Sequence, residues 1–321
     1  MNKLEILQDI LGGVEENHLL RGETRVEAGG VSEFYYQAND LEGLMKASAA
    51  ALIADVPYVV IGGGSNVLFS DLGYKGFVIK NSSSNISFLP DASQVIVDSG
   101  VSLSKLALES SARDLAGLEP FVCVPGTIGA AVLNNISSFS IQISNLIKSA
   151  TILFPKENNE FQVLKKNKDW LNFSSHYSKL CDMPGRKPVI LSLKLQLAHN
   201  KKEDVLKRLA YFQKLSRKIF PLGEKCLMIF KEELTEGRRA EEFIRGLDKF
   251  KIKKGTVSLS KINLNFIKNQ GRATAEDFRS IIEDLKLIIR EKTGVSLREN
   301  IEYFGNWSSL DMEKINEETQ I

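Results

Sequence analysis

Cysteine and histidine are scarce in this sequence, and their scarcity argues against a metal site. The three cysteines, Cys123, Cys181 and Cys226, form no CxxC pair, and the three histidines, at positions 18, 176 and 199, lie far apart. Residues so isolated do not have the ligand spacing of a metal-binding motif. We therefore expect a protein without a metal site and with reduced cysteines.

An excess of one charge and long apolar runs are absent as well. The 42 basic residues nearly balance the 40 acidic ones, so the net charge of +2 does not indicate a nucleic-acid partner. No apolar stretch approaches the length of a membrane span, and the amino-terminal region lacks the pattern of a secretion signal. These absences predict a cytoplasmic protein that binds a small molecule, with no nucleic-acid or membrane partner.

The length of 321 residues favours two or three compact units over a single one. Helical and strand-like patterns alternate in the first part, strand-like runs follow from Lys148 to Ala198, and a polar stretch at 199–202 precedes a helical pattern. We predict an α+β protein with units at residues 1–83, 84–200 and 201–321. The clearest predicted elements are helices at 41–51, 102–115, 203–219 and 275–293 and strands at 56–61, 94–98 and 189–197, with residues 311–321 frayed.

A glycine loop follows the strand predicted at 56–61. Gly62, Gly63 and Gly64 allow a sharp turn and leave no side chain between the backbone amides and a ligand, and Ser65 and Asn66 add polar side chains. Successive N–H groups of this kind suit a diphosphate. A glycine triplet after a strand is also a common tight turn, so the loop by itself leaves both interpretations open.

A second loop has similar chemistry. Pro125 fixes the chain entry, Gly126 and Gly129 allow close approach of the backbone, and Thr127 offers a hydroxyl next to Ile128. The alternative interpretation is an ordinary helix start. Two such loops, each after an apolar run, suit an elongated cofactor with a central diphosphate, so together they favour a dinucleotide cofactor.

Both loops resemble the flavin loops of the UDP-N-acetylenolpyruvoylglucosamine reductase (MurB) family. The resemblance rests on IGGGSNVLFSD at 61–71 and PGTIGAAVLNN at 125–135, and on matches that include Gly29-Gly30, Gly100 and the stretch 273–277. It implies FAD as cofactor, bound in part by Gly100 and Asn135 besides the two loops. It also implies the vanillyl-alcohol-oxidase/p-cresol-methylhydroxylase type of FAD-binding fold with a third, substrate-binding α+β domain, in the shorter of the family's two forms.

The resemblance further implies a reaction in peptidoglycan precursor synthesis. In that family NADPH reduces the flavin, which passes hydride to the enolpyruvyl double bond of a UDP-sugar. A serine or cysteine donates the proton, while an arginine and a glutamate stabilise the enolate. Here the three matching positions are His176 for the arginine, Met228 for the serine and Asn300 for the glutamate.

Each substitution removes a chemical property of the family's residue. Histidine lacks the permanent charge and bidentate fork of arginine, a thioether has no proton to donate, and an amide carries no charge. The alternative for His176 is a histidine in a surface loop. Glu232 and Glu302 stand where the family has an asparagine and often a basic residue, and a carboxylate there would repel a diphosphate. The acid pairs 232–233 and 241–242 otherwise indicate a solvated face.

Cys226 offers one route to a replacement proton donor. It lies two residues before Met228, so a small shift of the loop would bring its thiol near the flavin. A small buried cysteine without a chemical role is the alternative.

The sequence therefore predicts an FAD-binding oxidoreductase, with NADPH or NADH as reductant, whose family reaction is weakened or replaced by reaction with another substrate. One alternative is an FAD-binding pseudoenzyme with a regulatory or structural role. Another is a protein that keeps the fold alone and binds no flavin.

Overall fold

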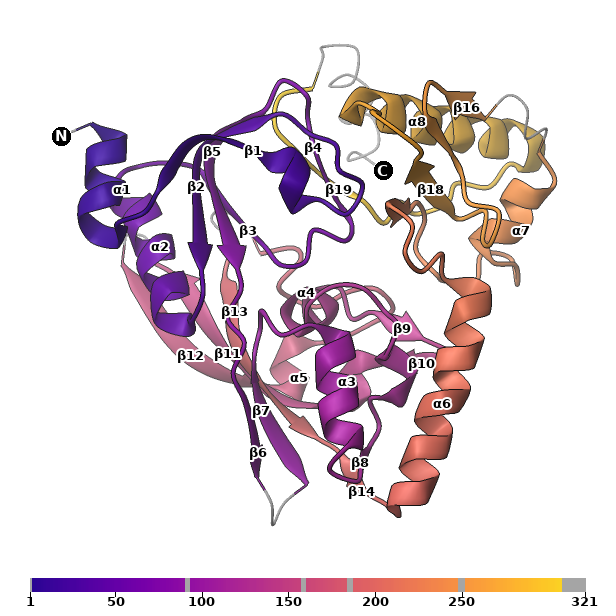
Figure 1. Ribbon diagram of the computed structural model, residues 1–321, viewed down its shortest axis with the longest axis horizontal. Coiled ribbons are helices and arrows are strands. Elements are labelled where there is room, and N and C mark those ends of the chain that lie inside the picture. Colours follow the sequence, from indigo (N-terminus) through magenta and orange to yellow (C-terminus); the bar gives the residue numbers. More distant parts are fainter. Residues whose placement is uncertain (1, 90–92, 157–159, 184–186, 248–251, 308–321) are drawn as a thin grey trace.

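The computed structural model describes residues 2–89, 93–156, 160–183, 187–247 and 252–307. Within them lie three sheets of four or five strands, one in each successive part of the chain, besides three two-stranded ones. Figure 1 shows the first two larger sheets beside each other and the third above α6. The sequence prediction that residues 311–321 are frayed falls outside the described residues. The boundaries predicted for the three units stay predictions.

The first sheet has the strand order β1-β2-β5-β3, with β1 antiparallel to β2 and the other pairs parallel. Helices α1 and α2 pack on it through a core that includes Leu7, Leu44 and Phe77, and Leu153 and Val189 of the second sheet join that core. The elements are α1 (Lys3–Leu11), β1 (Glu15–Leu19), η1 (Leu20–Glu23), β2 (Val31–Ala38), α2 (Leu41–Ile53), β3 (Tyr58–Ile61), β4 (Val67–Phe69) and β5 (Tyr74–Asn81).

The second sheet is antiparallel, in the order β12-β11-β13-β7-β6. Its strands are β6 (Ile86–Leu89), β7 (Gln94–Asp98), β11 (Ile147–Pro155), β12 (Phe161–Asn167) and β13 (Val189–Gln196). The elements beside it are α3 (Leu103–Ser111), β8 (Leu115–Ala116), η3 (Glu119–Phe121), α4 (Ile128–Leu133), β9 (Ser137–Ser138), β10 (Ile141–Gln142), η4 (Ile143–Asn145), α5 (Lys168–Leu171) and β14 (Ala198–His199).

The helix predicted at 102–115 is shorter than expected. It begins as predicted after Ser102, whose hydroxyl accepts a hydrogen bond from the Lys105 amide, but it ends at Ser111. Asp114 has a φ of 61°, outside the right-handed helical region, so the chain turns there and Leu115 enters β8. Apolar periodicity had carried the prediction one turn too far.

The carboxy-terminal part is built around α8 (Ala275–Thr293). Thr274 and Asp277 form the predicted capping box, and Gly294, with a φ of 73°, ends the helix as predicted. The helix packs on the sheet β15-β18-β17-β16, and α6 runs up to this part along α3 (Figure 1). The elements are α6 (Lys202–Ile219), β15 (Cys226–Met228), α7 (Ala240–Arg245), β16 (Lys253–Lys254), β17 (Val257–Leu259), β18 (Phe266–Asn269) and β19 (Glu302–Phe304).

The last strand of the carboxy-terminal part returns to the first part of the chain. β19 pairs in parallel with β4, which directly follows the first glycine loop, and the amide of Glu302 donates to the carbonyl of Asn66 at 3.1 Å. Residues 302–304 are therefore attached by their backbone to the segment that carries the loop.

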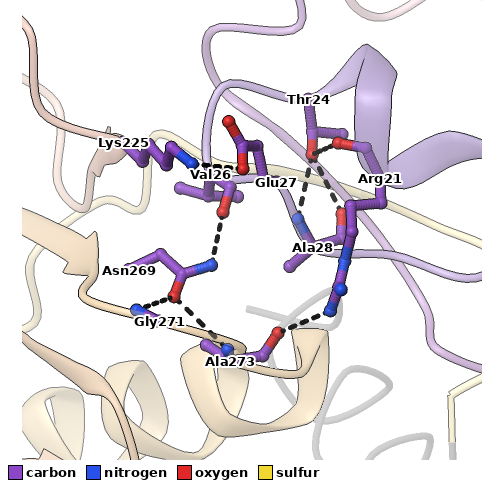
Figure 2. A network of polar contacts seen from close by, with 9 residues as sticks. All are labelled: Arg21, Thr24, Val26, Glu27, Ala28, Lys225, Asn269, Gly271 and Ala273. Carbon is purple, nitrogen blue, oxygen red and sulfur yellow. Dashed lines mark hydrogen bonds and ion pairs between the residues drawn. The ribbon is translucent and has the colours of Figure 1, made fainter.

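A polar network attaches the same two parts on another side (Figure 2). The Asn269 side chain donates to the carbonyl of Val26 at 2.8 Å and accepts from the amides of Gly271 and Ala273. Arg21 donates to the carbonyl of Ala273, and Lys225 forms an ion pair with Glu27. The segment 21–28, which precedes β2, is thereby held against the carboxy-terminal part.

Asp71 makes a third connection, because its carboxylate caps α8 from the other part of the chain. Its two oxygens accept from the amides of Ala275 and Glu276 at 3.0 and 2.9 Å. Amides in the first turn of a helix have no partner within the helix, and a negative charge there is favourable.

We expect Asp71→Ala to lower the free energy of unfolding by about 1 to 2 kcal/mol, because two amides lose their acceptor and the helix dipole loses its counter-charge. Urea unfolding followed by circular dichroism measures the change. Asp284→Ala, at an exposed position of the same helix, is the matched control. Equal stability of the two variants would contradict a capping role for Asp71.

Candidate FAD site

The two glycine loops lie directly against each other. A Cβ added at Gly62 would be 2.4 Å from the Thr127 hydroxyl oxygen, and one added at Gly63 would be 3.3 Å from the Cα of Gly126. Gly126, with a φ of 110°, faces the Ser65 hydroxyl. Glycine is therefore needed at these positions for the loops to meet as well as for ligand access.

The third glycine of the first loop is fixed by the segment before β2. Gly64 has a φ of 58°, a Cβ there would lie 1.9 Å from the carbonyl oxygen of Glu23, and its own carbonyl accepts from the Arg25 amide at 2.9 Å. The loop therefore has the shape of a tight turn, which was one of the two interpretations of the sequence. Because the turn is held tightly, its amides point in a fixed direction.

Several amides of the two loops have no partner within the protein. Among the residues that the structure describes, the main-chain N–H groups of Gly63, Gly64, Ser65, Gly126 and Thr127 form no hydrogen bond. Convergent amides of this kind bind anions, and bare glycine backbone lets a diphosphate approach closely. These amides therefore fit the diphosphate of FAD.

A cavity of about 150 Å³ opens beside the loops. Both loops border it, together with residues from distant parts of the chain that had been singled out in the sequence. The cavity lining includes Gly62, Gly63, Gly64, Ser65, Asn66, Pro125, Gly126, Thr127, His176, Cys226, Met228, Glu232, Asn300 and Glu302. The fold thus brings the two loops and all four predicted catalytic positions around one space.

A second cavity of about 650 Å³ adjoins the first. Gly62, Thr127, Ala130 and Asn134 border both, so the two cavities meet at the loops. The second runs along β3 and the start of β13 and is bordered by Gly129. An elongated ligand whose anionic middle lies at the loops has space on either side of them.

Three other residues predicted to bind the cofactor lie outside the two linings. Ile128 is buried in the core of the second part, and Gly100 packs where a Cβ would lie 2.6 Å from the carbonyl oxygen of Ser83. Asn135 is fully buried, donates to the Ser174 carbonyl at 2.7 Å and accepts from the Ser144 amide at 3.2 Å. In the structure these three residues shape the walls, and their contact with FAD stays a prediction.

Comparisons with known proteins agree with this arrangement. Residues 32–158 match the model of an FAD-binding domain, and residues 221–304 match the UDP-N-acetylenolpyruvoylglucosamine reductase C-terminal domain. The UDP-N-acetylenolpyruvoylglucosamine reductase of Anoxybacillus flavithermus is 31% identical over 95% of this chain and 99% of the relative. This chain belongs to the UDP-N-acetylenolpyruvoylglucosamine reductase family.

Other relatives support the same family. The reductase of Bacillus velezensis is 30% identical over 95% of this chain and 98% of its own length. The crystal structure of MurB from Thermus caldophilus has a TM-score of 0.72 at 24% identity and covers 91% of this chain and 99% of that one. The predicted α+β FAD-binding fold, the FAD cofactor and membership of an FAD-dependent reductase family are thereby confirmed.

His176, which the resemblance predicts to stand in place of the reductase family's arginine, is a buried residue. It is 6% exposed, and its φ of 52° places it in the left-handed region. Its carbonyl accepts from the Lys231 ammonium at 3.3 Å, while its Nε2 is buried and has no hydrogen-bond partner among the described residues. Burial lowers the pKa of His176, although the nearby carbonyl of Glu232 and charge of Glu233 oppose this in part. The ring is therefore held mainly in its neutral form.

Cys226 and Met228 project to the same side of β15. Alternate residues of a strand share a face, and both border the cavity, whereas Leu227 packs into the core under α8. Cys226 is 2% exposed and contacts the cluster of Phe220 and Phe266. Burial raises the pKa of its thiol, the nearby Arg25 lowering it to a smaller extent. The thiol therefore keeps its proton at neutral pH.

Asn66 of the first loop contacts two other predicted catalytic positions, Met228 and Asn300. Its side-chain oxygen accepts from the Met228 amide at 3.2 Å, and its side-chain nitrogen donates to the carbonyl of Asn300. Asn300 is brought there because its own amide donates to the Ile229 carbonyl at 2.8 Å. Both positions are thus fixed to the glycine loop through their main chains, whatever side chains they carry.

Glu232 does not lie on a solvated face as the acid pair had suggested. It borders the central cavity, and burial raises the pKa of its carboxyl, with Arg239 opposing this in part. The chain folds back after β15, which puts Glu232 inside while Glu236 remains exposed. Local charge pattern alone does not show such a reversal.

One charged residue that borders this cavity was missed in the sequence. Arg25 is a lone cation in a mixed polar segment, and no motif surrounds it. Its position becomes evident once the Gly64 carbonyl is seen to accept from its amide.

The structure describes no helix long and apolar enough to cross a membrane, and no group of three or more potential metal ligands among the described residues.

We expect Gly62→Ala to weaken FAD binding about 10- to 100-fold, because the added methyl overpacks the contact with Thr127 and separates the loops. A fluorescence titration with FAD measures the Kd. Gly22→Ala is the control, since a Cβ at Gly22 has nothing within 4 Å. Wild-type affinity in the Gly62 variant would show that contact between the loops does not matter for the cofactor.

We expect the imidazole of His176 to titrate below the ordinary value of 6.5. Since the folded protein then binds this proton less readily than the unfolded chain, the stability contributed by neutral His176 is lost as pH falls through that region. Proton NMR of the histidine rings measures the midpoint, with the resonance assigned by its loss in His176→Gln. A midpoint above 6.5 would mean that the position carries a cation near neutral pH.

Proposed function

We propose that this protein is an FAD-dependent reductase that takes electrons from NADPH or NADH and whose reaction with the enolpyruvyl UDP-sugar is weakened or replaced by reaction with another small substrate. The observation that carries the proposal is that positions 176, 228 and 300 border one cavity with both glycine loops. None of the three has the acid or the permanent charge that the family uses there. Its location in the cytoplasm also stays a prediction.

Bound FAD supplies hydride transfer at the cavity. The amides of residues 63–65 and 126–127 would bind its diphosphate, and the apolar side chains of Val124, Phe220 and Phe266 would exclude water on the side of β15. These roles require only backbone and apolar groups, which this chain retains.

Few side chains of the cavity can donate the proton that is required after hydride transfer. Met228 has none to donate, and neutral His176 with a buried Nε2 provides no fixed positive charge for an enolate. Cys226 is the neighbouring group on the same face of β15 that holds a proton at neutral pH. We propose the Cys226 thiol as the donor in whatever reduction remains.

The carboxylates of the cavity bear on the choice of substrate. Glu232 and Glu302 border it, and carboxylates close to a sugar diphosphate weaken its binding by repulsion between like charges. A substrate without a diphosphate, or with a hydroxyl or amine in that place, suits these groups better.

In stopped-flow mixing we expect NADPH or NADH to bleach the bound flavin, and the enolpyruvyl UDP-sugar to reoxidise it slowly. Met228→Ser should raise the rate of reoxidation by about 10²-fold or more, because a positioned proton donor typically contributes about 10²- to 10⁴-fold. Met228→Leu, which fills the space without a proton, is the control. Rapid reoxidation in the wild type would contradict the proposal, and no bleaching with either nucleotide would favour a pseudoenzyme.

For Cys226 we expect Cys226→Ala to abolish the residual reduction and Cys226→Ser to retain part of it. The acid form is required, so activity should be retained through neutral pH and fall as pH rises through the raised pKa of the thiol. The pH profile of flavin reoxidation measures both effects. Equal rates in the alanine variant and the wild type would remove Cys226 from the chemistry.

A further inference from the structure

Arg25 lies at the meeting point of the two glycine loops. Its amide donates to the carbonyl of Gly64, and its side chain borders the central cavity. It also borders a more open cavity of about 370 Å³, whose lining shares Gly63, Ser65 and Gly126 with the central one. The side chain thus borders two cavities, both of which are also bordered by the two loops.

The charge of Arg25 has no counterpart in the part of the chain that the structure describes. Its Nε is buried without a hydrogen-bond partner, and no carboxylate lies within ion-pair distance of the guanidinium. The neighbouring acids are engaged elsewhere, because Glu23 pairs with Lys80 at 3.1 Å and Glu27 pairs with Lys225. A partly buried guanidinium without an anion costs free energy, so its retention calls for a bound anion.

The position of the guanidinium narrows where that anion lies. It contacts the Cys226 thiol closely enough to affect the pKa of that group, which places it between the loops and β15. Among the described residues that border the central cavity, Arg25 is the one with a permanent positive charge, while Glu232 and Glu302 are acidic. Any negative charge held at this junction therefore has Arg25 as its counter-charge.

We propose that Arg25 binds the anionic part of FAD, with the diphosphate at the glycine loops as its partner. The amides of Gly63, Gly64 and Ser65 have no partner among the described residues, and the Gly64 carbonyl accepts from the Arg25 amide. The guanidinium and these amides therefore belong to neighbouring segments of the same site. A guanidinium matches phosphate oxygens in a bidentate way.

The proposal concerns cofactor binding and does not depend on which substrate is reduced. It also explains how a cavity that has a neutral histidine at position 176 and two carboxylates still accepts a ligand of negative charge. The permanent cation of the site comes from the segment before β2.

The test compares Arg25→Met, Arg25→Lys and, as control, Arg290→Met, at an exposed position near the end of α8. FAD and riboflavin are titrated into the full-length protein freed of flavin, and midpoint potentials are measured by dye equilibration. We expect Arg25→Met to weaken FAD binding about 10- to 100-fold and riboflavin binding little, because a charge-assisted hydrogen bond to phosphate is lost. Arg25→Lys should fall between, and the control should match the wild type.

The other outcomes also decide the matter. Unchanged affinity for oxidised FAD would overturn the assignment to the diphosphate, and a lowered midpoint potential beside it would place Arg25 near the reduced ring instead. Wild-type affinity and potential in Arg25→Met would overturn the proposal. A lower melting temperature of the flavin-free variant, with unchanged affinity of the folded fraction, would likewise overturn it, because Arg25 would then be structural.

Discussion

Contact between two stretches of bare backbone is the constraint on which this structure depends. Gly62 and Gly63 lie so close to Thr127 and Gly126 that a Cβ at Gly62 would clash with the Thr127 side chain and one at Gly63 would crowd the Gly126 backbone. The first loop follows β3 of the mixed sheet, and the second leads into α4 beside the antiparallel sheet. Glycines and the small side chains of Ser65 and Thr127 therefore form the contact between the loops, and the amides there that have no partner in the described part of the chain form a candidate anion site.

The carboxy-terminal part is attached to this junction by its backbone. β19 pairs with β4, Asn66 binds the main chain at Met228 and Asn300, and Asp71 caps α8. At Met228 and Asn300 the contact with Asn66 is made by main-chain atoms, so it does not depend on which side chains stand at these two positions.

The sequence predicted what depends on local pattern. Both glycine loops, the capping box of α8 and the strand at 94–98 are encoded by neighbouring residues, and the structure has them where they were expected. The family resemblance added the cavity positions, which no local pattern connects. The end of α3, the position of Glu232 at the cavity and the position of Arg25 beside Gly64 were missed, because each depends on a reversal of the chain or on a contact with a distant segment.

The site therefore has two parts, the backbone of the two glycine loops and a cavity lined by the side chains of His176, Met228 and Asn300. The first claim to test is that this site holds FAD. Purified protein incubated with FAD and freed of excess should release flavin on denaturation, and absorbance and mass spectrometry of the released flavin give its amount and identity. The account predicts one FAD per chain. A protein that remains colourless, with no flavin released, would contradict it.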